Sequence, residues 1–177
     1  MTKLLPTLGL LAATMLVQPA AAVAAPQVVV SIKPIHSLVA SIMKGIAEPE
    51  LILKGAGSPH TYQMKPADAE MLQNADLVFW VGPELEKFLE KPIESLSSNA
   101  KVVELEDAPG LTILPMREGG AFEPHDDGDE GHAEEGHGHD EGEHDAHIWL
   151  NTGNAKTLAK AITTALSETD QIGRAHV

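Results

Sequence analysis

The 177-residue sequence contains no cysteine. Disulfide bonds are therefore excluded, so a folded chain of this kind must be held together by its apolar core. Thiolate ligands are excluded as well, and any transition-metal site must be built from nitrogen and oxygen atoms. The nine histidines then become the first candidates for metal ligands, because the neutral imidazole ring is the commonest nitrogen ligand in proteins.

Aromatic and basic residues are also scarce. Phe, Trp and Tyr make up 3% of the chain, and the 12 Lys and Arg residues are outnumbered by 26 Asp and Glu residues. The net charge of -14 is local, because residues 123–145 hold eleven acids and no base, whereas the rest of the chain holds fifteen acids and twelve bases. Without a basic patch, the sequence predicts no nucleic-acid partner.

Motifs of the common hydrolase and nucleotide-binding families are absent from the sequence. The chain has no H-E-x-x-H zinc motif, no G-x-S-x-G turn, no Walker-type phosphate loop and no G-x-G-x-x-G after the first apolar run. Abundant carboxylates are predicted to be confined to residues 123–145, a segment too mobile to hold a general acid or base in place. These absences predict a binding protein rather than an enzyme.

The first residues have the pattern of an export signal. Lys3 precedes an apolar stretch over residues 4–17 that is too short to span a bilayer. Alanines at alternate positions then offer small-residue cleavage sites at Ala20, Ala22 and Ala24. We therefore expect residues 1–25 to be a signal peptide that is removed, in preference to the alternative of a buried N-terminal helix. No later run is long and apolar enough to predict a membrane span.

The remaining hydrophobic pattern alternates between strands and helices. Short apolar runs, several of them β-branched, predict buried strands at residues 27–32, 50–53, 76–81 and 101–105. Helices are predicted at residues 34–44, 66–74, 84–96 and 154–167. Pro92 should kink or split the third helix, and Asn151 or Thr152 should cap the fourth. The alternation predicts an α/β fold in which helices cover both faces of a parallel four-stranded sheet.

Residues 123–145 interrupt this pattern. Apart from glycine, Pro124 and Ala133 are their only non-polar residues, so ordering the segment would bury nothing that offsets the repulsion between its charges. We expect a disordered loop inserted into one α/β domain, which spans residues 26–122, resumes at residues 146–170 and is followed by an atypical tail at residues 171–177. The loop histidines are candidate accessory metal ligands, with a purely solubilising loop as the alternative: His125, His132, His137, His139 and His144.

Three histidines lie within the predicted domain. His60 lies in the turn-rich segment GAGSPHTY after the second strand, where functional groups gather on parallel sheets, although an exposed turn histidine is the alternative. His147 directly precedes the apolar tripeptide IWL, which should anchor its backbone. An anchored histidine can be held at the ~2.0–2.1 Å that zinc requires, so we predict His60 and His147 as metal ligands. His36, one turn into the first helix, could face the site or pack, and it is a further accessory candidate.

Several segments, taken in order, resemble the periplasmic zinc-binding protein of bacterial zinc ABC importers. They are VSIKPIHSLVASIMKG, LILKGAGSPHTY, KPADAEMLQNADLVFWVGPELEKFLEKP and HIWL, with the acidic, histidine-rich segment before the last. The resemblance covers essentially all of residues 1–170. It implies a solute-binding protein with two α/β lobes joined by a long helix, which holds Zn²⁺ in the cleft and passes it to a membrane permease in the periplasm. We also expect a monomer.

The family's ligands can be placed on this sequence by motif. The first ligand falls on His60 and the second on His147, and the charged loop is expected near the cleft mouth, where it would catch or relay zinc. The neighbour of the first ligand, which is a carboxylate in some members, is Pro59 here, so water is the expected substitute. Family members are longer, with a second lobe and a further histidine ligand. The final QIGRAHV departs from the family pattern, so we expect a truncated or frameshifted N-terminal lobe.

Three alternatives stay open at this point. A manganese- or iron-binding subunit of a related importer would share the architecture, although five loop histidines favour zinc over manganese. A periplasmic zinc buffer or chaperone would use the loop alone. A metallohydrolase would need an open coordination position and a fixed general base.

Overall fold

The computed structural model describes residues 25–116 and 144–175. Most of the predicted signal peptide, residues 1–24, lies outside the described residues, as do the last two residues of the chain. The greater part of the predicted loop also lies outside them, and with it His125, His132, His137 and His139. The domain boundaries that depend on these segments stay predictions.

Four short strands form one parallel sheet. They are β1 (Val28–Val30), β2 (Glu50–Leu51), β3 (Leu77–Trp80) and β4 (Lys101–Glu104), arranged in the order β2-β1-β3-β4. The prediction of a parallel four-stranded sheet is confirmed. The strands are shorter than predicted, most clearly β2, although the amides of Ile52 and Leu53 still donate to the carbonyls of Val30 and Ser31 beyond its end.

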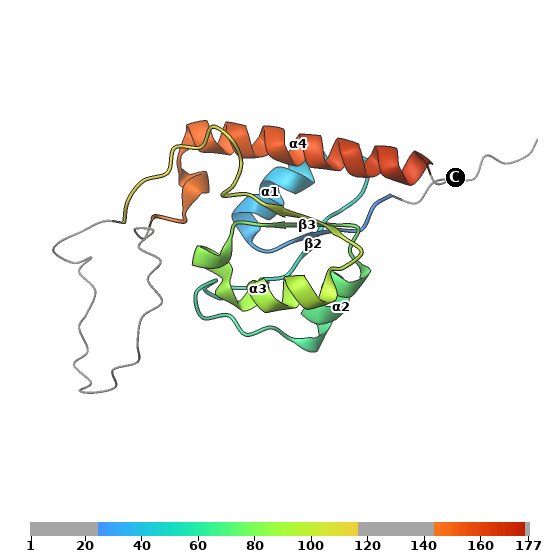
Figure 1. The fold of residues 1–177 in the computed structure, drawn as a ribbon, viewed down its shortest axis with the longest axis horizontal. Coiled ribbons are helices and arrows are strands. Elements are labelled where there is room, and N and C mark those ends of the chain that lie inside the picture. Colours follow the sequence, from blue (N-terminus) through green and yellow to red (C-terminus); the bar gives the residue numbers. More distant parts are fainter. Residues whose placement is uncertain (1–24, 117–143, 176–177) are drawn as a thin grey trace, which may run out of the picture.

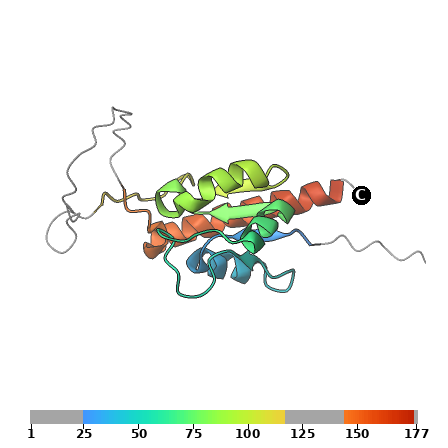
Figure 2. The ribbon, with the colours of Figure 1, turned by 90° about the horizontal axis from the view of Figure 1, so that it is seen from below.

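Helices cover both faces of the sheet, as predicted. Helices α1 (Lys33–Ile42) and α4 (Thr152–Ala175) lie on one face, whereas α2 (Pro66–Asn74) and α3 (Pro83–Leu96) lie on the other (Figures 1 and 2). A short 3-10 helix, η2 (Ile148–Leu150), precedes α4. Helix α4 continues beyond the predicted end at residue 167, and within the described residues no helix has the length and apolarity that crossing a bilayer requires.

The apolar side chains alternate between the two faces along the central strands β1 and β3. Val28 and Phe79 pack with the core formed by α1 and α4, whereas Val29 and Val78 pack with the core formed by α2 and α3. Successive side chains of a strand point to opposite faces, so a strand that is apolar throughout requires a helical layer on each side. This explains why short uninterrupted apolar runs in the sequence predicted the sheet correctly.

The irregularity in α3 differs from the prediction. Pro92 lies inside the helix, but the backbone leaves helical values at Glu86, where φ is -122° and ψ is 49°. The side chain of Glu86 turns back to accept hydrogen bonds from the amides of Val81 (2.7 Å) and Gly82 (3.3 Å). The break between the first turn and the rest of α3 therefore lies at Glu86 and not at the proline. It coincides with a buried carboxylate that caps the end of β3.

The described residues on either side of the predicted loop are hydrogen-bonded to each other. The amide of Asp145 donates to the carbonyl of Leu114 at 2.8 Å, and Pro115 and His144 form an antiparallel bridge. Closer to the body, the Asn154 side chain accepts from the amide of Thr112 at 2.8 Å and donates to the carbonyl of Thr112 at 2.9 Å. We call residues 112–116 and 144–148 the stem. It fixes the direction in which the chain enters η2 and α4.

Helix α4 begins with one of the two predicted caps. The side-chain oxygen of Asn151 accepts hydrogen bonds from the amides of Gly153 (2.7 Å) and Asn154 (3.3 Å). These bonds satisfy amides that lack partners within the helix. Asn151 rather than Thr152 is therefore the capping residue.

Replacing Asn154 by alanine should destabilise the fold. The residue is 2% exposed, and its side-chain amide nitrogen also donates to the carbonyl of Ile148 at 3.1 Å. Truncation therefore leaves backbone groups of Thr112 and Ile148 without their hydrogen-bond partner. We expect a loss of about 1–3 kcal/mol in the free energy of unfolding, measured by urea titration. The exposed Asn74→Ala variant is the control and should change stability by less than about 0.5 kcal/mol. Equal effects of the two substitutions would contradict the role assigned to the stem.

Candidate metal centre

His60 lies in the loop that connects β2 to α2. The loop is fixed two residues further on by Tyr62, whose hydroxyl donates to Asp68 at 2.8 Å and whose ring packs edge-on against Phe88 at a centroid distance of 5.0 Å. At its start, the Lys33 ammonium donates to the carbonyl of Gly55. The loop is therefore attached to helices on both faces of the sheet, while the His60 side chain itself remains exposed.

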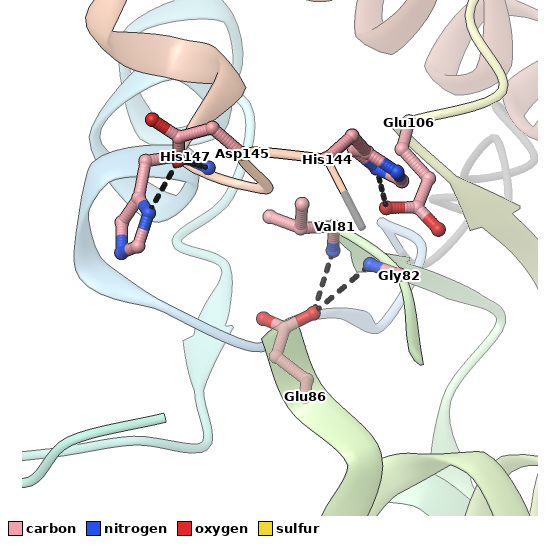
Figure 3. Close-up of polar contacts among 7 residues, drawn as sticks. All are labelled: Val81, Gly82, Glu86, Glu106, His144, Asp145 and His147. Atoms are coloured by element: carbon pink, nitrogen blue, oxygen red, sulfur yellow. Dashed lines mark hydrogen bonds and ion pairs between the residues drawn. The ribbon is translucent and has the colours of Figure 1, made fainter. Parts of the chain in front are cut away.

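His147 lies at the end of the stem, immediately before η2. Its neighbours Ala146 and Ile148 are buried in the core with α1 and α4, so the backbone is anchored on both sides of the histidine. Its own side chain is 43% exposed. The Nδ1 atom of the ring lies 2.7 Å from Oδ1 of Asp145, and the same oxygen accepts a hydrogen bond from the His147 amide at 3.0 Å (Figure 3).

The two predicted ligands, far apart in the sequence, lie side by side in the structure. The ring centroids of His60 and His147 are 5.7 Å apart and the ring planes are tilted by 52°. Two imidazoles that bind one tetrahedral zinc ion through bonds of about 2.0–2.1 Å have centroids roughly 5 Å apart. The centroid separation of the two rings is therefore close to the spacing that a shared ion requires.

The structure gives His36 and His144 different partners. Nε2 of His36 lies 2.9 Å from the carbonyl oxygen of Pro49, and the contact is partly buried. Nε2 of His144 lies 3.6 Å from Oε2 of Glu106, on the side of the stem next to β4 (Figure 3). His144 and Asp145 were predicted to belong to the loop, but both make defined contacts with the folded body.

Three carboxylates are held at the ends of β3 and β4, which corrects the prediction that carboxylates are confined to the mobile segment. Burial raises the pKa of Glu86 to about 7. Burial, together with the charges of Asp107 and Glu106, raises the pKa of Glu104 to about 7. Burial also raises the pKa of Glu106, and the opposing attraction of His144 limits that increase. The sequence could not reveal these groups, because their burial depends on tertiary packing.

Gly82 separates two of these acids. Glu86 accepts hydrogen bonds from the backbone on one side of the turn, and the Glu106 carboxyl lies so close on the other that a Cβ atom at position 82 would be 2.1 Å from Glu106 Cδ. Only a glycine permits this approach. The turn after β3 thus determines where Glu106, and with it the partner of His144, can lie.

The described residues supply a pair of histidines rather than a complete metal site. Among residues 25–116 and 144–175, no group of three or more histidine or acidic side chains is arranged to hold an ion. Asp145, which contacts His147, was not singled out in the sequence because it stands at the edge of the acidic segment. The signal that could have found it is a carboxylate two residues before an anchored histidine.

Comparison with known proteins assigns the family. Residues 28–177 match the family model for ZnuA, the periplasmic component A of a zinc-uptake complex. The chain belongs to this family. It is 49% identical over 163 residues to the high-affinity zinc uptake system protein ZnuA of Brucella abortus (strain 2308), in a match that covers 81% of this chain and 49% of that protein. The ZnuA protein of Yersinia pestis is 38% identical over 156 residues, covering 82% and 47% respectively.

The chain thus spans about half the length of the curated ZnuA relatives it matches. Solved structures support the same fold. A Mn-bound periplasmic metal binding protein from Candidatus Liberibacter asiaticus superposes with a TM-score of 0.61 at 23% identity, covering 82% of this chain and 46% of that one. The AdcAII protein of Streptococcus pneumoniae superposes with a TM-score of 0.59 at 20% identity, with the same coverage. At these identities the likeness shows the fold alone.

Replacing Gly82 by alanine should displace Glu106. The added methyl group would overlap the carboxyl at the end of the Glu106 side chain, which must swing away, and we expect a loss of about 1 kcal/mol in unfolding free energy. Gly57→Ala is the matched control, because a Cβ there would meet Tyr62 and Leu53 at 3.6–3.7 Å, which is ordinary van der Waals contact. Urea unfolding of both variants tests this; a Gly82→Ala protein as stable as the control would contradict the close approach.

The raised pKa of Glu86 predicts a dependence of stability on pH. Between about pH 4.5 and 7 the unfolded chain releases a proton that folded Glu86 retains, so stability falls as pH rises through this window. The change attributable to Glu86 is on the order of 3 kcal/mol. Glu86→Gln should therefore flatten the curve of unfolding free energy against pH, whereas the exposed Glu94→Gln on the same helix should leave it unchanged. Parallel curves for wild type and Glu86→Gln would refute the assignment.

Proposed function

We propose that the protein captures zinc in the periplasm and delivers it to the membrane permease of an ABC importer, as the binding subunit. The observation that carries this proposal is the approach of the His60 and His147 rings to 5.7 Å from segments almost ninety positions apart in the chain. Its matched relatives are named for high-affinity zinc uptake. In this proposal the zinc ion is the transported substrate.

The chemistry of the pair favours zinc over manganese. Both side chains offer imidazole nitrogen, which suits zinc, whereas manganese prefers sites rich in oxygen. Asp145, the carboxylate that contacts His147, is engaged with the Nδ1 atom of that ring at 2.7 Å. A manganese- or iron-binding subunit of the same architecture is therefore the second candidate, and isothermal titration with each metal separates the two.

Binding rather than catalysis is supported by the position of the fixed carboxylates. The Glu86 side chain is 0% exposed and accepts hydrogen bonds from two backbone amides, so it has no access to a water molecule on a bound ion. Glu106 is directed toward His144 rather than toward His147 (Figure 3). A metal-activated water would need a base aimed at it.

The pair alone should bind zinc less tightly than a complete site. Zinc sites normally contain three or four protein ligands, and the described residues bring two together. We propose that water completes the coordination here and that the remaining ligands of the whole protein come from the part that this chain does not span. The monomeric state stays a prediction.

Calorimetric zinc titration of the full chain tests the site. We expect zinc to bind more tightly at the His60–His147 pair than at the loop histidines. His60→Ala and His147→Ala should each weaken this tighter binding by at least about tenfold, because each removes one of the two ligands of the pair. His36→Ala is the matched control, since that ring already contacts the Pro49 carbonyl and should leave zinc affinity within about twofold of wild type.

A variant lacking residues 123–143 separates the proposed site from a loop-based zinc buffer. The deletion removes four loop histidines and leaves His144 and Asp145, which contact the folded body. We expect this variant to retain one zinc ion per chain. If it binds no zinc while the His60→Ala and His147→Ala proteins bind as wild type does, the body site is refuted and the buffer function is correct.

A further inference from the structure

The contact between Asp145 and His147 has the geometry of a carboxylate that orients a metal-binding histidine. Oδ1 of Asp145 lies 2.7 Å from Nδ1 of the ring, a short distance typical of a charge-assisted hydrogen bond. The same oxygen accepts from the His147 amide at 3.0 Å, so the carboxylate holds both the ring and the backbone of one residue. A carboxylate can only accept, so the ring nitrogen that faces it must carry the proton.

Asp145 is itself held in place by the stem. Its amide donates to the carbonyl of Leu114 at 2.8 Å, and the preceding residue, His144, is bridged to Pro115. On its other side, the chain enters the core at Ala146, which is 5% exposed. The carboxylate is therefore presented from a fixed backbone, which an orienting group requires if it is to restrict its partner.

Fixing the proton on Nδ1 leaves Nε2 with a free lone pair. A metal ion binds only a deprotonated ring nitrogen, and free histidine favours the opposite tautomer, in which Nε2 carries the proton. Figure 3 shows Nδ1 at the carboxylate and the second nitrogen turned away from it. The adjacent His144 differs, because there it is Nε2 that faces a carboxylate, at the longer distance of 3.6 Å from Glu106.

We propose that Asp145 is a positioning residue for metal binding, which selects the Nδ1–H tautomer of His147 and so makes Nε2 the atom offered to the ion beside His60. This inference rests on the proposed function. Asp145 acts through His147 and does not itself bind the ion. Outer-shell carboxylates of this kind typically contribute 10–100-fold to metal affinity.

Nitrogen-15 NMR of the metal-free full chain at about pH 8.5, where free imidazole is neutral, measures the tautomer directly. The His147 signals are assigned by their loss in His147→Ala. We expect the Nδ1–H form in wild type, a shift toward Nε2–H in Asp145→Ala, and an intermediate result in Asp145→Asn, which keeps an acceptor oxygen without the charge. A wild-type Nε2–H ring, or an unchanged spectrum in Asp145→Ala, overturns the proposal.

Zinc titration of the same variants supplies the second readout. Asp145→Ala should lower affinity by about 10–100-fold, with a smaller loss in Asp145→Asn. Asp76→Ala is the control, because its carboxylate accepts from the Gln27 amide at 2.7 Å in a contact that involves no histidine, and it should leave zinc affinity unchanged even if stability falls.

The outcomes distinguish this inference from the function on which it rests. If His147→Ala weakens zinc binding and Asp145→Ala does not, the positioning role is wrong and the site stands. If His147→Ala itself has no effect on zinc binding, the proposed site is wrong. Thermal unfolding of each variant establishes that a loss of affinity is measured on folded protein, and Asp145→Asn provides the test if Asp145→Ala fails to fold.

Discussion

The parallel pairing of β1 with β2 and β3 is the constraint on which the rest of the structure depends. Because the strands run in the same direction, the chain leaves each of them at the same edge of the sheet. The loop that contains His60, the turn at Gly82 and the acids Glu104 and Glu106 all follow from this arrangement. His147 reaches this region by a different route, through the stem and the packing of α4 on the sheet.

The same edge of the sheet carries both the histidine pair and a group of buried acids. The acids Glu86 and Glu106 lie on opposite sides of the turn at Gly82, and the second of them faces His144 (Figure 3). His144, at the end of the acidic segment, and His147, just after it, are thus each matched with a carboxylate, the first with Glu106 and the second with Asp145. The described end of this segment, His144 and Asp145, therefore joins the folded body through specific contacts.

The sequence predicted those features that depend on local pattern. Apolar runs identified every strand of the sheet, and the bounds of α2 agree with the prediction, because strand and helix periods are properties of the chain itself. His60 and His147 were selected because turn residues and an apolar tripeptide anchor their backbones. Their proximity required the fold. Glu86 was not recognised, because no pattern in the neighbouring sequence indicates that its side chain is buried. Without that information, the break in α3 was assigned to Pro92 instead of Glu86.

The surroundings of the His147 ring have a thermodynamic consequence. Asp145 holds one nitrogen, and the rings of His60 and Trp149 lie at centroid distances of 5.7 and 5.4 Å. The side chain of His147 therefore loses its rotamer freedom when the polypeptide folds and not when an ion binds. Binding of a metal ion to a preorganised imidazole costs less conformational entropy than binding to a freely rotating one. Preorganisation therefore raises the affinity of the pair for the ion even though both rings are partly exposed to solvent.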